Sequence, residues 1–356
     1  MRIDKERISY IDIAKGLGML LVIWGHIRET GISNAMVYAF HMPLFFFLSG
    51  MTYCARKYDS VLKLIRRRLH TLIIPYAIFS VFTWLVWFAY NHILGNTVES
   101  YWMPLLQTVI SQGSGGYLVH NSPLWFVTCL FCVELIYYFT SKLPLQWNTV
   151  LCIVMAVAGN LMIRPDSPVR YLPWSLDMAL CALPFYLAGN IVSEKAGIEN
   201  VSGLINRKKL LFSALVIAFL VLLYFGARYN GPVSMGHRKL NMPYVFYPLA
   251  FVGIAMHLSL SVLLSNLHNV IIAGVRWFGN YSFNVMAVQT PIKGVILVVL
   301  GKLLHRSVAE LSNSTGYSLI AFVITLIAVT IVVMIINRLT EWAKERRQNR
   351  ERKQNT

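Results

Sequence analysis

A small set of ionisable residues lies inside or beside the long apolar stretches of this chain. They are Asp12, Lys15, His26, His41, Glu134, Asp177, His257 and Lys293. Charged and titratable side chains are costly at membrane depth, so each of them is a candidate functional residue. The two histidines nearest the N-terminus attract most interest, because an imidazole titrates near neutral pH and suits general acid–base catalysis.

The stretch from Asp12 to His26 places three of these residues on one side of a helix. At about 100° per residue, Lys15 and His26 are about 20° apart around the axis, and Asp12 is about 40° from His26. Lys15 and His26 are separated by roughly 16 Å along the axis, and Asp12 is close enough to Lys15 to neutralise part of its charge. We therefore expect one site with a cation at one end and an imidazole at the other. The alternative is that these are three unrelated polar residues near helix ends. Small residues in the same stretch, which allow close approach of another helix or of a ligand chain, are Gly16, Gly18 and Gly25.

The next apolar stretch, HMPLFFFLSG (41–50), begins with a second histidine. Because the chain reverses direction between the two helices, His41 is predicted to lie at about the depth of His26. The pair could act in acid–base catalysis or bind a metal. Zinc takes three or four ligands, and no further ligand is clearly placed, so we favour acid–base chemistry and expect no metal.

Further polar residues lie beside or within the other apolar stretches. Arg66, Arg67 and Arg68 precede an apolar stretch, where they anchor the helix or clamp a phosphorylated ligand, since arginine pairs with phosphate in a bidentate manner. Glu134, within FCVELIYYF, requires a partner or a water-filled cavity. The others have structural explanations: Asp177 and Lys293 can reach water from helix ends, and His257 can form a hydrogen bond within the bundle.

The composition indicates the elements that position these residues. Of the 356 residues, 56% are hydrophobic and 13% are charged, whereas soluble domains carry about 25% charged residues. A membrane helix needs about 20 mostly apolar residues, and such windows occur at 9–27, 35–55, 70–90, 122–141, 147–163, 172–192, 209–227, 243–265, 281–301 and 315–337. The predicted fold class is therefore an all-α integral membrane protein, one polytopic bundle over 1–340 followed by a basic cytoplasmic tail over 341–356.

The distribution of Lys and Arg predicts the orientation of the bundle. The segment 56–69 is rich in cations, whereas the long loop 91–121 has none, which places both termini in the cytoplasm. The net charge of +17 then lies mainly beside anionic membrane lipid, and no nucleic-acid partner is expected. Five cysteines in or near apolar stretches argue against a disulfide framework.

Several of these segments resemble the membrane-bound acyltransferase family 3. YIDIAKGLGMLLVIWGH (10–26) is similar to the first-helix motif of the family, in which a Lys or Arg precedes a His by eleven positions. HMPLFFFLSG resembles the second-helix motif. PLWFVTCLF (123–131) and LPFYLAGN (183–190) resemble the branch of fucose 4-O-acetyltransferases, and GNYSFNVMAVQTP (279–291) resembles a late motif.

The resemblance implies that His26 is the catalytic histidine and Lys15 its basic partner. Asp12 and His41 join the candidate catalytic set, and Lys15 with the arginines 66–68 forms the candidate donor-binding set. Possible acceptor-side or helper residues are Ser49, Glu134, Tyr281, Ser282 and Gln289. The chain departs from the family pattern twice: Thr71 stands in place of a second arginine after Arg68, and Gln289 in place of a late histidine.

The activity implied by the resemblance is O-acetyl transfer from acetyl-CoA, as co-substrate, to a hydroxyl of a cell-surface polysaccharide or its lipid-linked precursor. His26 would act as general base or accept the acyl group itself. The expected location is a cell membrane, in particular a bacterial inner membrane, crossed several times. The sequence leaves open a second function, a transporter or flippase for a lipid-linked glycan, because transporters also contain intramembrane charges and helices broken by proline.

Overall fold

A computed structural model describes residues 9–169 and 171–354. These residues form helices and loops without a β-strand, apart from an isolated pairing of Ser234 with Lys239. The helices are α1 (Ser9–Ile27), α2 (Ile32–Thr52), α3 (Val61–Arg68), α4 (Ile74–Leu94), α5 (Met103–Gln107), α6 (Trp125–Thr140), α7 (Leu145–Met162), α8 (Leu176–Ile191), α9 (Ile198–Arg207), α10 (Lys209–Asn230), α11 (Pro243–Ser265), α12 (Val270–Asn280), α13 (Ser282–Leu304), α14 (Val308–Asn313) and α15 (Thr315–Gln354).

Within the described residues, 10 helical segments are long and apolar enough to cross a membrane. They coincide with the predicted windows and confirm an all-α polytopic membrane protein. The third segment, Val61–Leu94, is longer than predicted because a π-helical turn, Leu69–Ile73, joins α3 to α4. The basic segment after residue 340 continues α15, and its cytoplasmic location stays a prediction.

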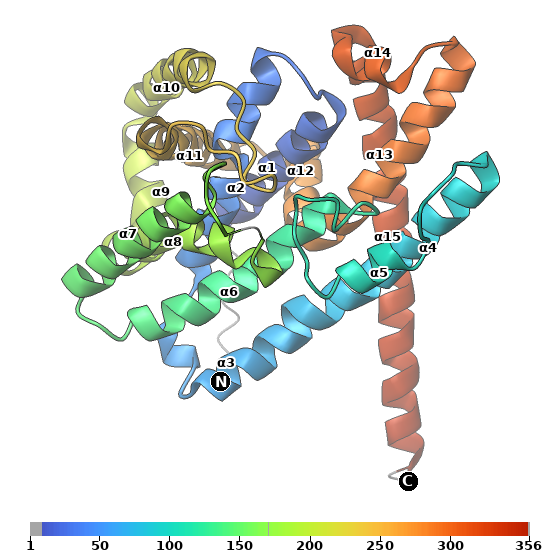
Figure 1. The fold of residues 1–356 in the computed structure, drawn as a ribbon. Coiled ribbons are helices and arrows are strands. Elements are labelled where there is room, and N and C mark those ends of the chain that lie inside the picture. The colour runs from blue at the N-terminus through green and yellow to red at the C-terminus, as the bar shows by residue number, and fades with distance from the viewer. Residues whose placement is uncertain (1–8, 170, 355–356) are drawn as a thin grey trace.

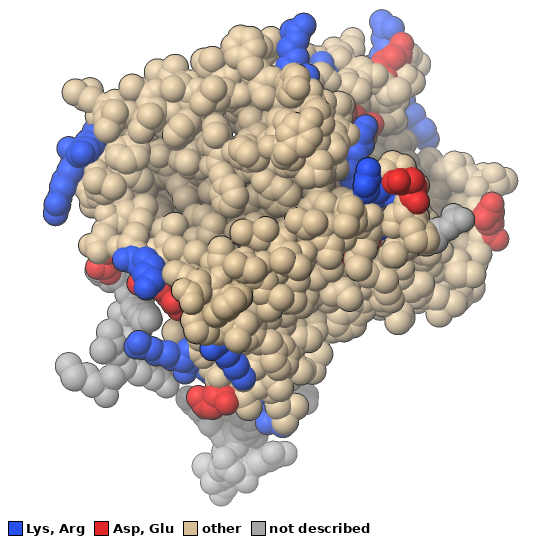
Figure 2. Space-filling view, turned by 60° about the vertical axis from the view of Figure 1, so that its left-hand side comes forward, with Lys and Arg blue, Asp and Glu red and all other residues tan. Residues whose placement is uncertain are grey.

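The ten segments divide into inner and outer helices (Figure 1). In the segments that contain α1, α2, α6 and α8, 61–72% of the residues are buried inside the protein, whereas in those that contain α4, α7, α10 and α15 only 11–22% are buried. The exposed side chains are mainly Ile, Leu, Val and Phe. Figure 2 shows one side of the protein with its charged residues around the edges and almost none across the middle. Such a surface suits hydrocarbon as solvent, and the buried inner helices can hold a polar site.

The helix α1 packs in the interior against α2, α11, α12 and α13. A Cβ atom at Gly16 would overlap the carbonyl of Val275, and one at Gly279 would overlap the carbonyl of Asp12, so the backbones of α1 and α12 are in contact. The other two glycines of α1 face aromatic rings of α2. The glycines of α1 therefore serve helix packing, which was one of the two possibilities that the sequence left open.

The contact between α1 and α12 can be tested with two glycines of the same helix. Gly279→Ala inserts a methyl group against the backbone of α1, and overpacking of this kind costs about 1–3 kcal/mol. Gly274 has open space around its Cβ position, so Gly274→Ala is the matched control. We expect Gly279→Ala alone to lower the thermal unfolding midpoint of the detergent-solubilised protein. Equal midpoints for the two variants would contradict the close contact.

Candidate functional site

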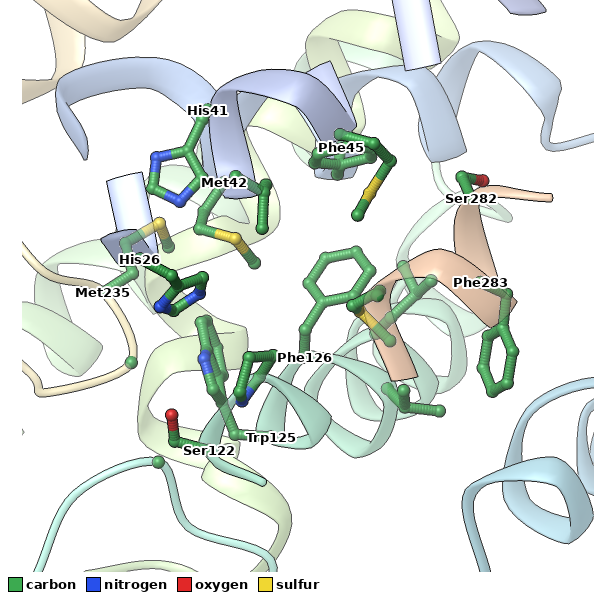
Figure 3. A pocket seen from close by; sticks show the side chains of 18 of the residues that line it. His26, His41, Met42, Phe45, Ser122, Trp125, Phe126, Met235, Ser282 and Phe283 are labelled. Carbon is green, nitrogen blue, oxygen red and sulfur yellow. The ribbon is translucent and has the colours of Figure 1, made fainter. Parts of the chain in front are cut away.

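A cavity of about 270 Å³ lies between α1, α2, α6 and α13 (Figure 3). The helix α1 lines it with Lys15, Met19, Val22 and His26. Residues separated by four, seven and eleven positions share one face of a helix. Lys15 and His26 therefore lie on the same wall of one cavity, as their spacing predicts.

The helix α2 forms the opposite wall and brings His41 to the level of His26. The ring of Tyr38 packs edge-on against both imidazoles, with its centroid 6.3 Å from that of His26 and 4.8 Å from that of His41. Figure 3 shows both imidazoles at one end of the cavity and Ser282 at the other, with aromatic side chains between them. The two histidines therefore line the same end of one cavity.

Hydrogen bonds constrain the residues at this end of the cavity. Nδ1 of His41 lies 2.8 Å from the carbonyl oxygen of Val37 and must donate to it, so Nε2 of the neutral ring keeps its lone pair. Nζ of Lys293 donates to the carbonyl oxygen of His26 (3.2 Å) and lies 3.9 Å from Oε1 of Glu29. Lys293 thus contacts the end of α1. Among the described residues, the cavity lining contains no carboxylate.

Two loops complete the histidine end, and the second of them, over residues 231–242, was missed by the reasoning from sequence. Gly113 from one loop and Ser234 to His237 from the other line the cavity beside Trp125. A Cβ atom at Gly113 or at Gly236 would collide with the Trp125 ring, so both loops pack directly on the indole. A hydrogen bond of 2.8 Å joins Oγ of Ser234 to Nδ1 of His237. The signal in the sequence was a histidine in a short loop between two membrane segments.

Each loop is fixed to the helices beneath it. Nδ1 of His120 lies 3.0 Å from Oγ1 of Thr83, and burial lowers the pKa of His120 to about 4. Nε of Arg238 lies 2.9 Å from Oδ2 of Asp177, whose side chain is fully buried. The expectation that Asp177 reaches water is therefore wrong. The 231–242 loop covers the first turn of α8, and Arg238 supplies the opposite charge.

Glu134 is paired with Arg68, which confirms that this buried carboxylate requires a partner. Neither residue lines the cavity. Arg66 and Arg67 are exposed on α3 and also lie outside the cavity lining, with Arg67 over the ring of Tyr58. The structure therefore does not bring the three arginines to the cavity wall.

The remaining candidates fall into two groups. Ser49 and Ser282 line the cavity, and Oγ of Ser49 donates to the carbonyl oxygen of Phe45. Asp12 and Gln289 are buried outside the lining, and Gln289 donates to Thr290.

His257 was expected to form a hydrogen bond within the helix bundle. Nε2 of His257 lies 2.9 Å from the carbonyl oxygen of Ala14 and donates to it, which confirms a hydrogen bond within the bundle. Among the described residues, no group of three or more His, Cys, Asp and Glu side chains is arranged to hold a metal.

The fold and the site together define a multi-pass membrane protein with a histidine-lined internal cavity. The chain matches the acyltransferase domain family over residues 8–337 and belongs to that family. No curated protein and no solved structure matches it. Membership of the acyltransferase family makes the protein a membrane acyltransferase, which uses an acyl donor as co-substrate.

Proposed function

We propose that this acyltransferase moves an acetyl group from acetyl-CoA to a hydroxyl of a cell-surface polysaccharide or its lipid-linked precursor, as in the fucose 4-O-acetyltransferases that it resembles. One observation carries the proposal: a single cavity connects Lys15 to the end that holds His26 and His41. A cation suits the phosphates of a CoA donor, and an imidazole suits the activation of a hydroxyl. Membership of the family favours this function over a transporter.

The donor would enter from the Lys15 end. Between Lys15 and His26 the walls are apolar, formed by Met19, Val22 and Phe126 among others, and the two residues are roughly 16 Å apart along α1. This shape suits a narrow flexible arm, with the nucleotide outside the cavity near the exposed Arg66 and Arg67. The charge pattern of the loops favours the cytoplasmic side of the membrane for this end and its outer face for the histidine end.

The chemistry would take place at His26. Its imidazole removes the proton from the acceptor hydroxyl, whose oxygen attacks the thioester carbonyl. The CoA thiolate then leaves and takes this proton from the imidazolium. In the covalent variant the imidazole itself attacks the thioester, releases the thiol and then passes the acetyl group to the hydroxyl. His41, with Nε2 as an acceptor, is a second base beside it, and Ser49 and Ser282 are helper residues toward the donor end. Asp12, Glu134 and Gln289 would act only by supporting the helices that line the cavity.

The donor end can be tested with Lys15→Gln. A hydrogen bond to a charged group contributes about 1.5–3 kcal/mol, so we expect the KM for acetyl-CoA to rise roughly tenfold or more and the KM for the acceptor to stay unchanged. The assay follows the release of CoA thiol by purified protein, with a polysaccharide acceptor and mass spectrometry of the O-acetylated product. Lys302→Gln, in the last turn of α13 and exposed, is the control. An unchanged donor KM in Lys15→Gln would contradict this assignment.

The proposed reaction as a whole is tested by deleting the protein from its host. Loss of O-acetyl groups from the surface polysaccharide, with normal export of the polymer, is the expected result. Unchanged acetylation together with impaired export would instead favour the transporter.

A further inference from the structure

A second and larger cavity, of about 1580 Å³, opens between α7 and α11. Pro184 of α8 contributes to its floor, and the loop 231–242 closes one end. We call it the lateral groove. His237 lines both this groove and the cavity that contains His26, so the groove adjoins the site of the proposed chemistry at this residue.

The lining of the lateral groove changes from apolar to polar along its length. Ile153 and Val157 of α7 line it within the helix and are more than half exposed, which places them against hydrocarbon. Beyond the end of α7, the groove is lined by Arg164, and beside the start of α11 by Lys239 and Asn241. An amphiphile with its tail in the bilayer and its head at the membrane surface has the same order of apolar and polar parts.

The charges at the polar end favour an anionic head group. Among the described residues that line the lateral groove there are cations and no carboxylate. Arg238 is paired with the buried Asp177 and serves to hold the loop. Arg164 lies 3.6 Å from Asp166 on its exposed side. Lys239, which is exposed, adds a positive charge next to His237.

We propose that the lateral groove binds the acceptor as a sugar joined to a lipid through a phosphate. The lipid tail lies between α7 and α11, the phosphate lies at Lys239 and Arg164, and the sugar reaches past His237 toward His26. This inference rests on the proposed function and selects the lipid-linked precursor over the finished polymer. A polymer without a lipid would have no use for an apolar wall that is open to the bilayer.

The binding experiment uses the purified full-length protein in nanodiscs of phosphatidylcholine, with a radiolabelled polyprenyl phosphate as probe. Val157→Trp fills the apolar part of the groove. Val154→Trp is the matched control, because Val154 is equally exposed on α7 but lies outside the groove lining. We expect at least tenfold weaker binding in Val157→Trp and unchanged binding in Val154→Trp. Equal affinities in the two variants would overturn the proposal.

The head group is tested with charge variants and competitors. Lys239→Gln combined with Arg164→Gln should weaken binding of polyprenyl phosphate about tenfold, whereas Lys302→Gln should not. Uncharged polyprenol and inorganic phosphate should each compete poorly, since the site needs both parts of the ligand. Competition by phosphatidylglycerol as strong as that by polyprenyl phosphate would overturn the choice of occupant, because the groove would then be a general lipid site.

Binding is measured without turnover, so its result is independent of the catalytic proposal. Loss of acetyl transfer in His26→Ala with intact probe binding supports both ideas. If His26→Ala still transfers acetyl groups and binding of the probe still depends on Val157, only the catalytic role of His26 is contradicted and the groove proposal stands. A further test compares acetylation of a water-soluble oligosaccharide by Val157→Trp and by the wild type. Equal rates with equal KM would show that the acceptor enters by another route and would overturn the groove proposal.

Discussion

His26→Ala is expected to lower the rate of acetyl transfer by about 10²- to 10⁴-fold, the usual contribution of a general acid–base group. The imidazole lines the same cavity as Lys15 and as the loop that carries His237. An acyl-imidazole mechanism would give a loss at the upper end of this range. His41, whose Nε2 keeps its lone pair while Nδ1 donates to the carbonyl oxygen of Val37, would support only weak residual activity, because it acts from a different position on α2.

The control for this variant is His92→Ala, because His92 is exposed in the last turn of α4. Transfer is measured with purified protein, and O-acetylation of the surface polysaccharide is measured in cells with the membrane abundance of each variant. The His26 variant should remain folded, because the half-buried side chain borders a cavity and its removal leaves little strain. Full acetylation in cells whose membranes contain normal amounts of the His26→Ala variant would contradict the catalytic role of His26.

Arg68→Ala or Glu134→Ala is expected to lower the free energy of unfolding by about 3–5 kcal/mol, because each leaves an uncompensated charge in a buried site. The Glu134 side chain is 3% exposed and that of Arg68 is 21% exposed. Replacing both charges with apolar side chains of similar volume is often neutral. The double variant Arg68→Met/Glu134→Leu should therefore recover most of the stability lost in either single variant, as read from thermal unfolding midpoints in detergent.

The same double variant separates the structural role of Arg68 from a role in binding the donor. If Arg68 only neutralises Glu134, the stable double variant keeps the wild-type KM for acetyl-CoA. A tenfold rise in that KM would instead support the phosphate clamp that the cluster of arginines in the sequence suggested. Lys63→Gln, on the same helix and exposed, reports on the general effect of removing a cation from this end of the protein.

The amino-acid sequence by itself determined the ten membrane segments, because hydropathy over about 20 residues is a local property. It also determined that Lys15 and His26 share a face, since the α-helical repeat fixes the angle between residues of one helix. The departures from the family pattern at Thr71 and Gln289 remain unexplained by the cavity, which neither residue lines.

Only the tertiary structure decided which residues meet across the chain. Arg68 pairs with Glu134, Arg238 pairs with Asp177, and the loop with His237 completes a site whose first residues lie more than 200 positions earlier. The sequence showed that Glu134 needed a partner, but a local pattern could not choose among many cations. Such contacts depend on how the helices pack, and packing also places the lateral groove against the loop that carries His237.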